Sequence, residues 1–222
     1  MKTTYRILMG IVFFLVIILG GIRFCLTSFF IDLEYRTPGF PEDQFGFTTR
    51  DRAQLAYQSV DYLLGNISDQ DYQNLSFPDG HPIFNQRELS HMRDVRDLTV
   101  ITMRIWYLSL IALLLGIVLA FSLGWQRDLM KAGKTSASVI LLFIFTVLLA
   151  VILNFNQLFT SFHSIFFEGD TWLFYTSDSL IRLFPTPFWV NVFVAIGVIA
   201  FTLALILYFS CGWLLRKNKK EA

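Results

Sequence analysis

The stretch SVILLFIFTVLLAVILNFNQLFT, residues 138–160, decides the fold. It contains no charged side chain, and a helix of this length, rising about 1.5 Å per residue, crosses a hydrocarbon layer about 30 Å thick. Three further apolar runs of comparable length are Ile7–Phe30, Ile105–Gly124 and Phe188–Trp213. The sequence therefore predicts an all-α integral membrane protein with four transmembrane helices.

The composition agrees with this prediction. Of the 222 residues, 55% are hydrophobic and 16% are charged, and the mean hydropathy is +0.55. An average soluble domain is about 45–50% apolar and about 25% charged, so a soluble enzyme and a disordered tail are both excluded. The net charge of +1 gives no electrostatic preference for nucleic acid, which is not an expected partner.

The positive charges predict the orientation, because lysines and arginines next to short loops resist translocation. If the N-terminus is cytoplasmic, the inner segments 1–6, 125–137 and 214–222 contain all six lysines. The outer segments 31–104 and 161–187 contain 15 of the 17 acidic residues. We therefore predict a multi-pass protein with both termini in the cytoplasm and its larger loops outside.

The predicted division of the chain follows from these runs. It comprises an N-terminal transmembrane helix (1–30), a small extracytoplasmic cap that includes an outward extension of the second long helix (31–104), and the remaining spans with the outer loop 161–187 (105–222). A cap of this size has a marginal core of its own, so it should lean on the membrane helices. A helix over Arg50–Leu64, capped by Thr49, is expected to pack on the next long helix.

The second long helix is predicted to begin at Asn85, because Glu88 three residues later completes a capping-box pattern. No helix breaker follows before Gly116. We therefore expect one continuous helix from Asn85 to Gly124, whose first four turns or so stand clear of the membrane.

The first apolar run follows Lys2 and Arg6, as in a secretory signal, but it is too long and has no A-x-A-like cleavage site. It is expected to remain as a membrane helix. Phe24 beside Cys25 is a poor match to a lipoprotein processing site, so the protein is not expected to be a lipoprotein itself. Cys25 and Cys211 fall near opposite membrane faces, too far apart for a disulfide, and buried packing is the simplest role for each.

Acid-base chemistry near neutral pH would depend on three histidines, His81, His91 and His163, all in the outer segments. On a helix, His91 shares a face with Glu88 and Asp94, either of which would fix its tautomer. The alternative is a solvated charged face that carries a histidine without a function. His81 lies in a predicted turn and is expected to be an exposed loop residue.

Polar residues also recur at the end of the third run, where Asn156, Thr160 and His163 follow at helical spacing. Polar groups at membrane depth are costly unless they are paired or face a wet cavity, so this stripe is predicted to face inward. A functional site and simple helix–helix hydrogen bonding both explain it. For Arg23, in the first run, snorkelling to the outer interface is the simplest role.

Three ordered stretches and the four-span layout resemble the lipoprotein intramolecular transacylases of low-GC Gram-positive bacteria. They are Glu88-Leu-Ser-His91-Met-x-Asp94-Val, Phe162-His163-x-x-Phe166-Phe167-x-x-Asp170-x-Trp172, and Asp178-x-Leu180-Ile181-x-Leu183-x-Pro185. The similarity covers nearly the whole chain. It implies an acyltransferase of the bacterial cell membrane, which moves the sn-2 acyl chain of a lipoprotein's diacylglyceryl-cysteine to the α-amine of that cysteine and leaves a lyso-form, N-acylated lipoprotein.

The sequence contains no G-x-S-x-G elbow, no outer cysteine beside a histidine and no H-E-x-x-H. Three histidines without a tight ligand spacing make a weak zinc site, so neither a metal nor a cofactor is expected. A base that acts on the substrate's own amine is the simplest role that remains.

With the resemblance, the expected general base is His163, which lies closest to the expected membrane surface. His91 is expected to contact the developing oxyanion or to orient the substrate, with Asp94 as its partner. Expected substrate contacts are Arg23, Asn156, Asp170 and Trp172. The expected partners are diacylglyceryl-modified lipoproteins and membrane lipid, met at an active site on the extracytoplasmic side. The alternative is a non-enzymatic outer-face binding or sensor protein, which would tolerate replacement of both histidines.

Overall fold

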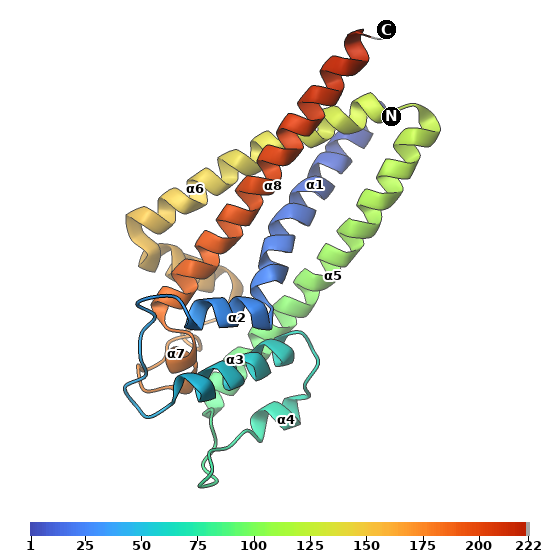
Figure 1. Ribbon diagram of the computed structural model, residues 1–222. Helices are drawn as coiled ribbons and strands as arrows, with labels where there is room; N and C mark the ends of the chain where they lie inside the picture. Colours follow the sequence, from blue (N-terminus) through green and yellow to red (C-terminus); the bar gives the residue numbers. More distant parts are fainter. Residues whose placement is uncertain (221–222) are drawn as a thin grey trace. The chain divides into compact units, whose positions relative to one another are not determined.

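Eight helices form the regular structure over residues 1–220, the part of the chain that the computed structural model describes (Figure 1). In chain order they are α1 (Lys2–Cys25), α2 (Ser28–Tyr35), α3 (Thr49–Leu63), α4 (Asp69–Gln73), α5 (Gln86–Leu123), α6 (Gln126–Phe166), α7 (Ser179–Leu183) and α8 (Thr186–Lys220). Helices α1, α5, α6 and α8 are long and apolar enough to cross a membrane, which confirms the four predicted spans.

The chain folds into two compact units. The first contains residues 1–23, 102–149 and the described chain from Val194 onward, and the second contains Phe24–Ile101 and Ala150–Phe193. Helices α5, α6 and α8 therefore each contribute to both units.

In the first unit, α1, α6 and α8 meet through small and branched side chains. The buried cluster consists of Ile17, Ala137, Ile140, Ile144, Ala200 and Ala204. Alanines at such a contact let helix backbones approach closely, which favours association where lipid removes the hydrophobic driving force. Two hydroxyls add contacts to the backbone, from Ser136 to the Gly10 carbonyl and from Tyr5 to the Gly116 carbonyl, each at 2.8 Å.

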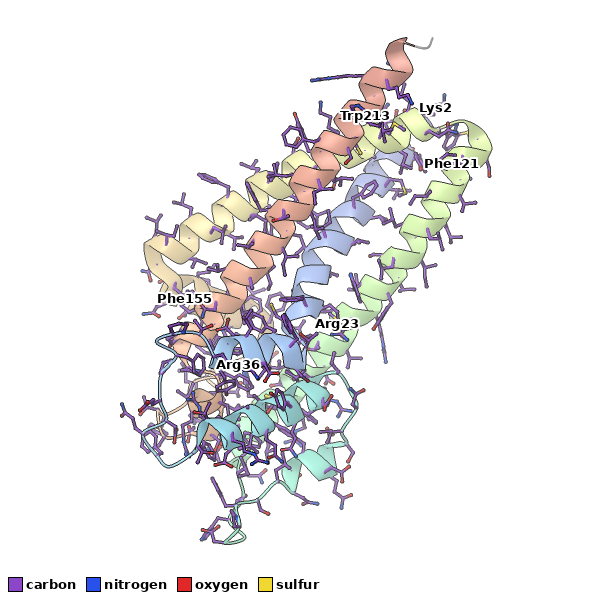
Figure 2. The ribbon with its side chains drawn as sticks, viewed as in Figure 1. Lys2, Arg23, Arg36, Phe121, Phe155 and Trp213 are labelled. Carbon is purple, nitrogen blue, oxygen red and sulfur yellow. The ribbon has the colours of Figure 1, made fainter. Side chains whose placement is uncertain are left out.

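The outward side chains of the first unit are large and apolar. Phe121 on α5 and Trp213 on α8, both labelled in Figure 2, are 67% and 63% exposed. A soluble protein rarely exposes such an apolar surface, whereas helices that face lipid require it.

The first helix is shorter than predicted. Helix α1 ends at Cys25, and Thr27 adopts an extended conformation and caps α2. Its hydroxyl accepts the N–H of Phe30 at 3.2 Å and donates to the Phe24 carbonyl at 2.7 Å. Threonine is a favoured N-cap, so the apolar run Ile7–Phe30 contains a helix boundary that hydropathy does not reveal.

In the second unit, α3 begins one residue after its N-cap Thr48, whose capping box is closed by Asp51. The cap is therefore Thr48 and not the predicted Thr49. Helix α3 packs against α2, α4 and α7. Its Tyr62 joins Leu89 and Met92 of α5 in one buried cluster.

Helix α5 confirms the predicted continuous helix, since it runs unbroken from Gln86 to Leu123. The side-chain oxygen of Asn85 accepts the N–H groups of Arg87 and Glu88 at 3.0 and 3.1 Å. In return, the Glu88 carboxylate accepts the N–H of Asn85 at 2.7 Å. The capping-box prediction is therefore confirmed at this helix start.

A buried ion pair holds the irregular stretch after α2 to α7. The Arg182 guanidinium donates to both oxygens of Asp43 at 2.9 and 3.0 Å, and Arg52 donates to the carbonyls of Arg182 and Pro41 at 2.9 and 2.6 Å. Burial opposes ionisation of Asp43, but the hydrogen bonds from Arg182 and from two backbone N–H groups lower its pKa to about 2. This pairing gives the second unit a fixed polar framework.

Candidate active site

A local break in α6 starts the helical segment that carries His163. Asn154 has a non-helical backbone (φ −163°, ψ 85°), and its side-chain oxygen accepts the N–H of Gln157 at 3.1 Å. This is the geometry of an N-cap, a position that asparagine favours. The residues from Phe155 to Phe166 therefore form a helical segment with its own start inside the second unit.

His163 is buried near the end of this segment, with 8% of its surface exposed. Its Nδ1 lies 2.8 Å from the carbonyl oxygen of Phe159. Because a carbonyl oxygen can only accept, Nδ1 carries the proton. In the neutral ring Nε2 then holds the free lone pair, which is the form that a general base requires.

The fold brings His91 beside His163, although 71 positions separate them in the sequence. The two imidazoles stack with their ring centroids 6.0 Å apart and their planes at 22°. Trp172 lies 4.9 Å from His163, and the Phe167 ring lies 4.9 Å from His91 in an edge-on arrangement. Aromatic rings therefore surround both histidines.

This apolar surrounding favours the neutral imidazoles. His91 lies on the part of α5 that precedes the apolar run, and burial, followed by the nearby His163, lowers its pKa to about 4. His163 follows the third apolar run, and burial lowers its pKa also, although the hydrogen bond to Phe159 opposes this. Both rings are therefore uncharged near pH 7 and can accept a proton.

Two buried polar atoms at this site have no hydrogen-bond partner among the described residues, namely Nδ1 of His91 and Nε1 of Trp172. Leaving a buried polar group unpaired costs about 1–3 kcal/mol, and such groups often mark functional sites. An indole N–H can only donate, so Trp172 offers a donor beside His163 for an oxygen of a bound molecule.

Glu88 fixes the segment that follows α6 against α5. It is 1% exposed, and its second carboxylate oxygen accepts the N–H of Leu180 at 2.7 Å, at the start of α7. Burial raises its pKa, and the backbone hydrogen bonds oppose this rise. Glu88 was expected as the capping-box residue of α5 and as a neighbour of His91. No sequence signal predicted its second role, the bond to Leu180 that positions the connection that carries Trp172.

The structure corrects two expectations about side-chain contacts. Within the described chain, Asp94 makes no hydrogen bond to His91, because it is exposed one turn further along α5. Asn156 and Thr160 are also exposed, so the stripe does not face inward as a whole. Only His163 is covered, because the segment after α6 folds back over the last helical turn and lays Trp172 on it.

The remaining predicted residues differ in their exposure. Arg23, labelled in Figure 2, is half-buried at the end of α1 in the first unit. Asp170 is exposed in the α6–α7 connection, and His81 is exposed in its turn, as expected. In the part of the chain that the structure describes, no group of three or more His, Cys, Asp or Glu residues is placed to hold a metal ion.

Comparisons with known proteins give one consistent result. The chain matches the family model of the lipoprotein intramolecular transacylase Lit over residues 7–189. An uncharacterized protein of Aquifex aeolicus (strain VF5) is 27% identical over 189 residues, which cover 85% of this chain and 84% of that protein.

Solved structures share the fold. The membrane-integral lipoprotein intramolecular transacylase Lit of Bacillus cereus superimposes with a TM-score of 0.81 at 19% identity, over 100% of this chain and 99% of that one. A variant of that protein with one histidine replaced by arginine gives a TM-score of 0.72 at 16% identity, over 100% and 95% of the two chains.

Proposed function

Because the matching family model spans most of its length, this chain belongs to the lipoprotein intramolecular transacylase family, and we propose that His163 and His91 carry the reaction. The protein is a multi-pass membrane enzyme. The observation that supports this site is the stacking of the two buried imidazoles at 6.0 Å, with Nε2 of His163 left free to accept a proton.

The reaction joins two groups of one substrate molecule. The α-amine of the lipidated cysteine attacks the sn-2 ester carbonyl, the new C–N bond forms, and the bond to the glyceryl oxygen breaks. The attack closes a ring of about eight atoms, and holding this ring in place supplies a large part of the catalysis. One proton passes from the amine nitrogen to the glyceryl oxygen, which leaves as a hydroxyl on the same lipoprotein.

His163 moves this proton. Its Nε2 accepts the proton from the attacking nitrogen and returns it to the departing glyceryl oxygen. The Phe159 carbonyl supports this role, because its hydrogen bond keeps the proton of the neutral ring on Nδ1 and stabilises the imidazolium that forms.

His91 and Trp172 contact the carbonyl oxygen on which negative charge develops. Trp172 offers its unpaired indole N–H, and His91 has a ring nitrogen without a partner. Donors fixed in an apolar surrounding stabilise such an oxyanion without reorganisation. Glu88 supports both residues, since it ties α5 to the start of α7.

Four other predicted residues are assigned contacts with the substrate. Asp94, exposed one turn from His91, places a negative charge where it attracts the α-ammonium of the substrate before deprotonation. Asn156 and Asp170 offer exposed polar groups on either side of His163 in the sequence. Arg23 is proposed to contact ester carbonyls from the end of α1.

We further propose that this site faces the extracytoplasmic side and that both termini are cytoplasmic, on the basis of the lysine distribution. Gln70, Tyr175 and Arg127 are all exposed and can each be replaced by cysteine. A membrane-impermeant thiol reagent should label positions 70 and 175 in intact cells and position 127 only after lysis. The reverse pattern would place the histidines in the cytoplasm.

The function is tested by coexpression with a lipoprotein in a host that lacks other N-acylating enzymes. Because transfer within the molecule leaves the mass of the N-terminal lipopeptide unchanged, fragmentation must show the acyl chain on nitrogen. The wild type and the His81→Ala variant, in which an exposed histidine is replaced, should give this product, and His163→Ala should not. A free amine with the wild type would remove the function, whereas N-acylation by His163→Ala would remove only the site.

A further inference from the structure

A groove of about 520 Å³ opens in the first unit between α1 and the first half of α6. The Ser136–Gly10 hydrogen bond sets the register of the two helices, and Tyr5 of α1 packs with Ala132 of α6. The helices therefore run parallel, and the groove has a polar end near their starts and an apolar end further along. Its lining includes Arg6, Lys131 and Thr135, followed by Ile7, Ile11 and Val139.

The polar end carries an excess of positive charge. The Nε of Arg6 lies 3.4 Å from Asp128, and a terminal nitrogen of Arg6 donates to the Thr3 hydroxyl at 3.3 Å. An adjoining hollow of about 230 Å³ shares Lys131 with the groove and adds Lys134. The three cations are Arg6, Lys131 and Lys134. The carboxylate of Asp128 offsets one of these charges, so the polar end of the groove attracts an anion.

This combination fits a molecule that has an anionic head and a hydrocarbon chain. Cavities of about 300–1,000 Å³ hold small ligands, and in a membrane the abundant amphiphile of this kind is an anionic phospholipid. We propose that the α1–α6 groove binds one anionic phospholipid, with its phosphate on Arg6 and Lys131 and an acyl chain along Ile7, Ile11 and Val139. The site is independent of the acyl-transfer chemistry.

Such a lipid would stabilise the first unit. Helix α6 contributes small side chains such as Ala132 and Ala137 to the buried clusters that it forms with α1, so a bound chain adds contacts that these alanines do not supply. A ligand that binds only the folded protein raises the unfolding temperature with its concentration.

The test uses the full-length protein, delipidated in a neutral detergent. Its unfolding temperature is measured with added phosphatidylglycerol, with phosphatidylcholine of the same chains, and with inorganic phosphate. Phosphatidylglycerol should raise the unfolding temperature by several degrees, and native mass spectrometry should show one retained molecule. Equal shifts with both lipids, or the full shift with phosphate alone, would overturn the proposal.

Two variants separate the groove from a general surface attraction. Lys131→Gln should weaken phosphatidylglycerol binding at least tenfold, while Arg127→Gln, which removes an exposed cation outside the groove, should not. Gly10 lines the groove and a Cβ added there meets nothing within 4 Å, so the side chain of Gly10→Leu should occupy the groove. Its lipid-free unfolding temperature should be unchanged or higher, because leucine favours the helix, and its phosphatidylglycerol shift should disappear. A full shift in Gly10→Leu would contradict the proposal.

Discussion

Each of the two units is stabilised internally by a different kind of interaction. The first unit packs alanines, glycines and branched side chains between long helices and exposes its large apolar residues. The second unit buries charged and aromatic groups, such as the Arg182–Asp43 pair and the carboxylate of Glu88, in specific hydrogen bonds. Hydrogen bonds are directional and hold side chains within a narrow range of positions. Contacts between small residues hold the helix backbones at a fixed distance instead. The histidine pair that we propose as the site lies in the unit where side chains are fixed.

The largest effect is expected from breaking the helix that carries His91. A proline at position 95 clashes with the carbonyl four residues earlier, that of His91 itself, and removes a helical hydrogen bond. Val95→Pro should abolish N-acylation of a coexpressed lipoprotein while the protein still inserts into the membrane. Val95→Ala keeps the helix and should remain active. Full activity in Val95→Pro would show that His91 does not depend on the helix.

The second largest loss of activity is expected from replacing the histidines. Loss of a positioned base typically reduces the rate by about 10²–10⁴-fold, so His163→Ala should leave only trace transfer of a synthetic diacylglyceryl lipopeptide by purified protein. His91→Ala should be similarly severe, and Asp94→Asn milder, because Asp94 is exposed and makes no bond to His91. If Asp94→Asn were as slow as His163→Ala, the assigned roles would be wrong.

Glu88→Ala should reduce the rate of transfer less than the histidine substitutions do, because it removes support for the site and keeps the histidines themselves. It leaves the N–H groups of Asn85 and Leu180 without their acceptors, and the buried Leu180 group costs about 1–3 kcal/mol when unpaired. The unfolding temperature should fall and the rate of transfer should drop by roughly tenfold. Glu88→Gln keeps one oxygen acceptor, so its unfolding temperature and its rate should lie between those of the wild type and Glu88→Ala. An unchanged rate in Glu88→Ala would refute the positioning role.

In the first unit, overpacking should reduce stability and leave the chemistry intact. A Cβ at Gly197 would lie 2.8 Å from Leu148, which is closer than van der Waals contact. Because alanine gains the same helix propensity over glycine at both positions, Gly197→Ala should be less stable than Gly10→Ala by about 1 kcal/mol, with a normal rate of transfer at low temperature. Gly10→Ala, where the added group meets open space, is the matched control. A large loss of rate in folded Gly197→Ala would contradict the proposal that the chemistry depends on side chains of the second unit.

The last effect concerns pH and appears only in acid. The folded protein lowers the pKa of His91 to about 4, whereas an unfolded histidine titrates near 6.5. Between these values the unfolded chain binds a proton that the folded protein resists, so the free energy of unfolding should decrease as the pH falls from about 6.5 to 4. Thermal unfolding across this range should show a shallower decrease in His91→Gln than in the wild type. An equal slope in both would mean that His91 is not buried as described.

The sequence predicted the elements whose signals are local. Apolar runs gave the four spans, and the Asn85–Glu88 spacing gave the start of α5. It did not predict the break at Thr27 or the restart of α6 at Asn154, because the hydropathy of an apolar run does not reveal a single capping residue within it.

The candidate site was predictable in its residue types but not in its contacts. Both histidines were identified, yet their stacking depends on how the segment after α6 folds back onto α5. Pairs such as Glu88 with Leu180, and Arg182 with Asp43, join residues 92 and 139 positions apart, so no local spacing reveals them.

The central claim is that the histidine pair transfers an acyl chain directly within one lipoprotein molecule. It is tested most directly by mixing two synthetic diacylglyceryl lipopeptides, one with both acyl chains deuterated and one unlabelled, with the purified protein. Every N-acylated product should carry two chains of the same label, and the His163→Ala variant should form almost none. Products that combine a deuterated and an unlabelled chain would contradict the account, because they require an acyl group that leaves its molecule before it reaches nitrogen.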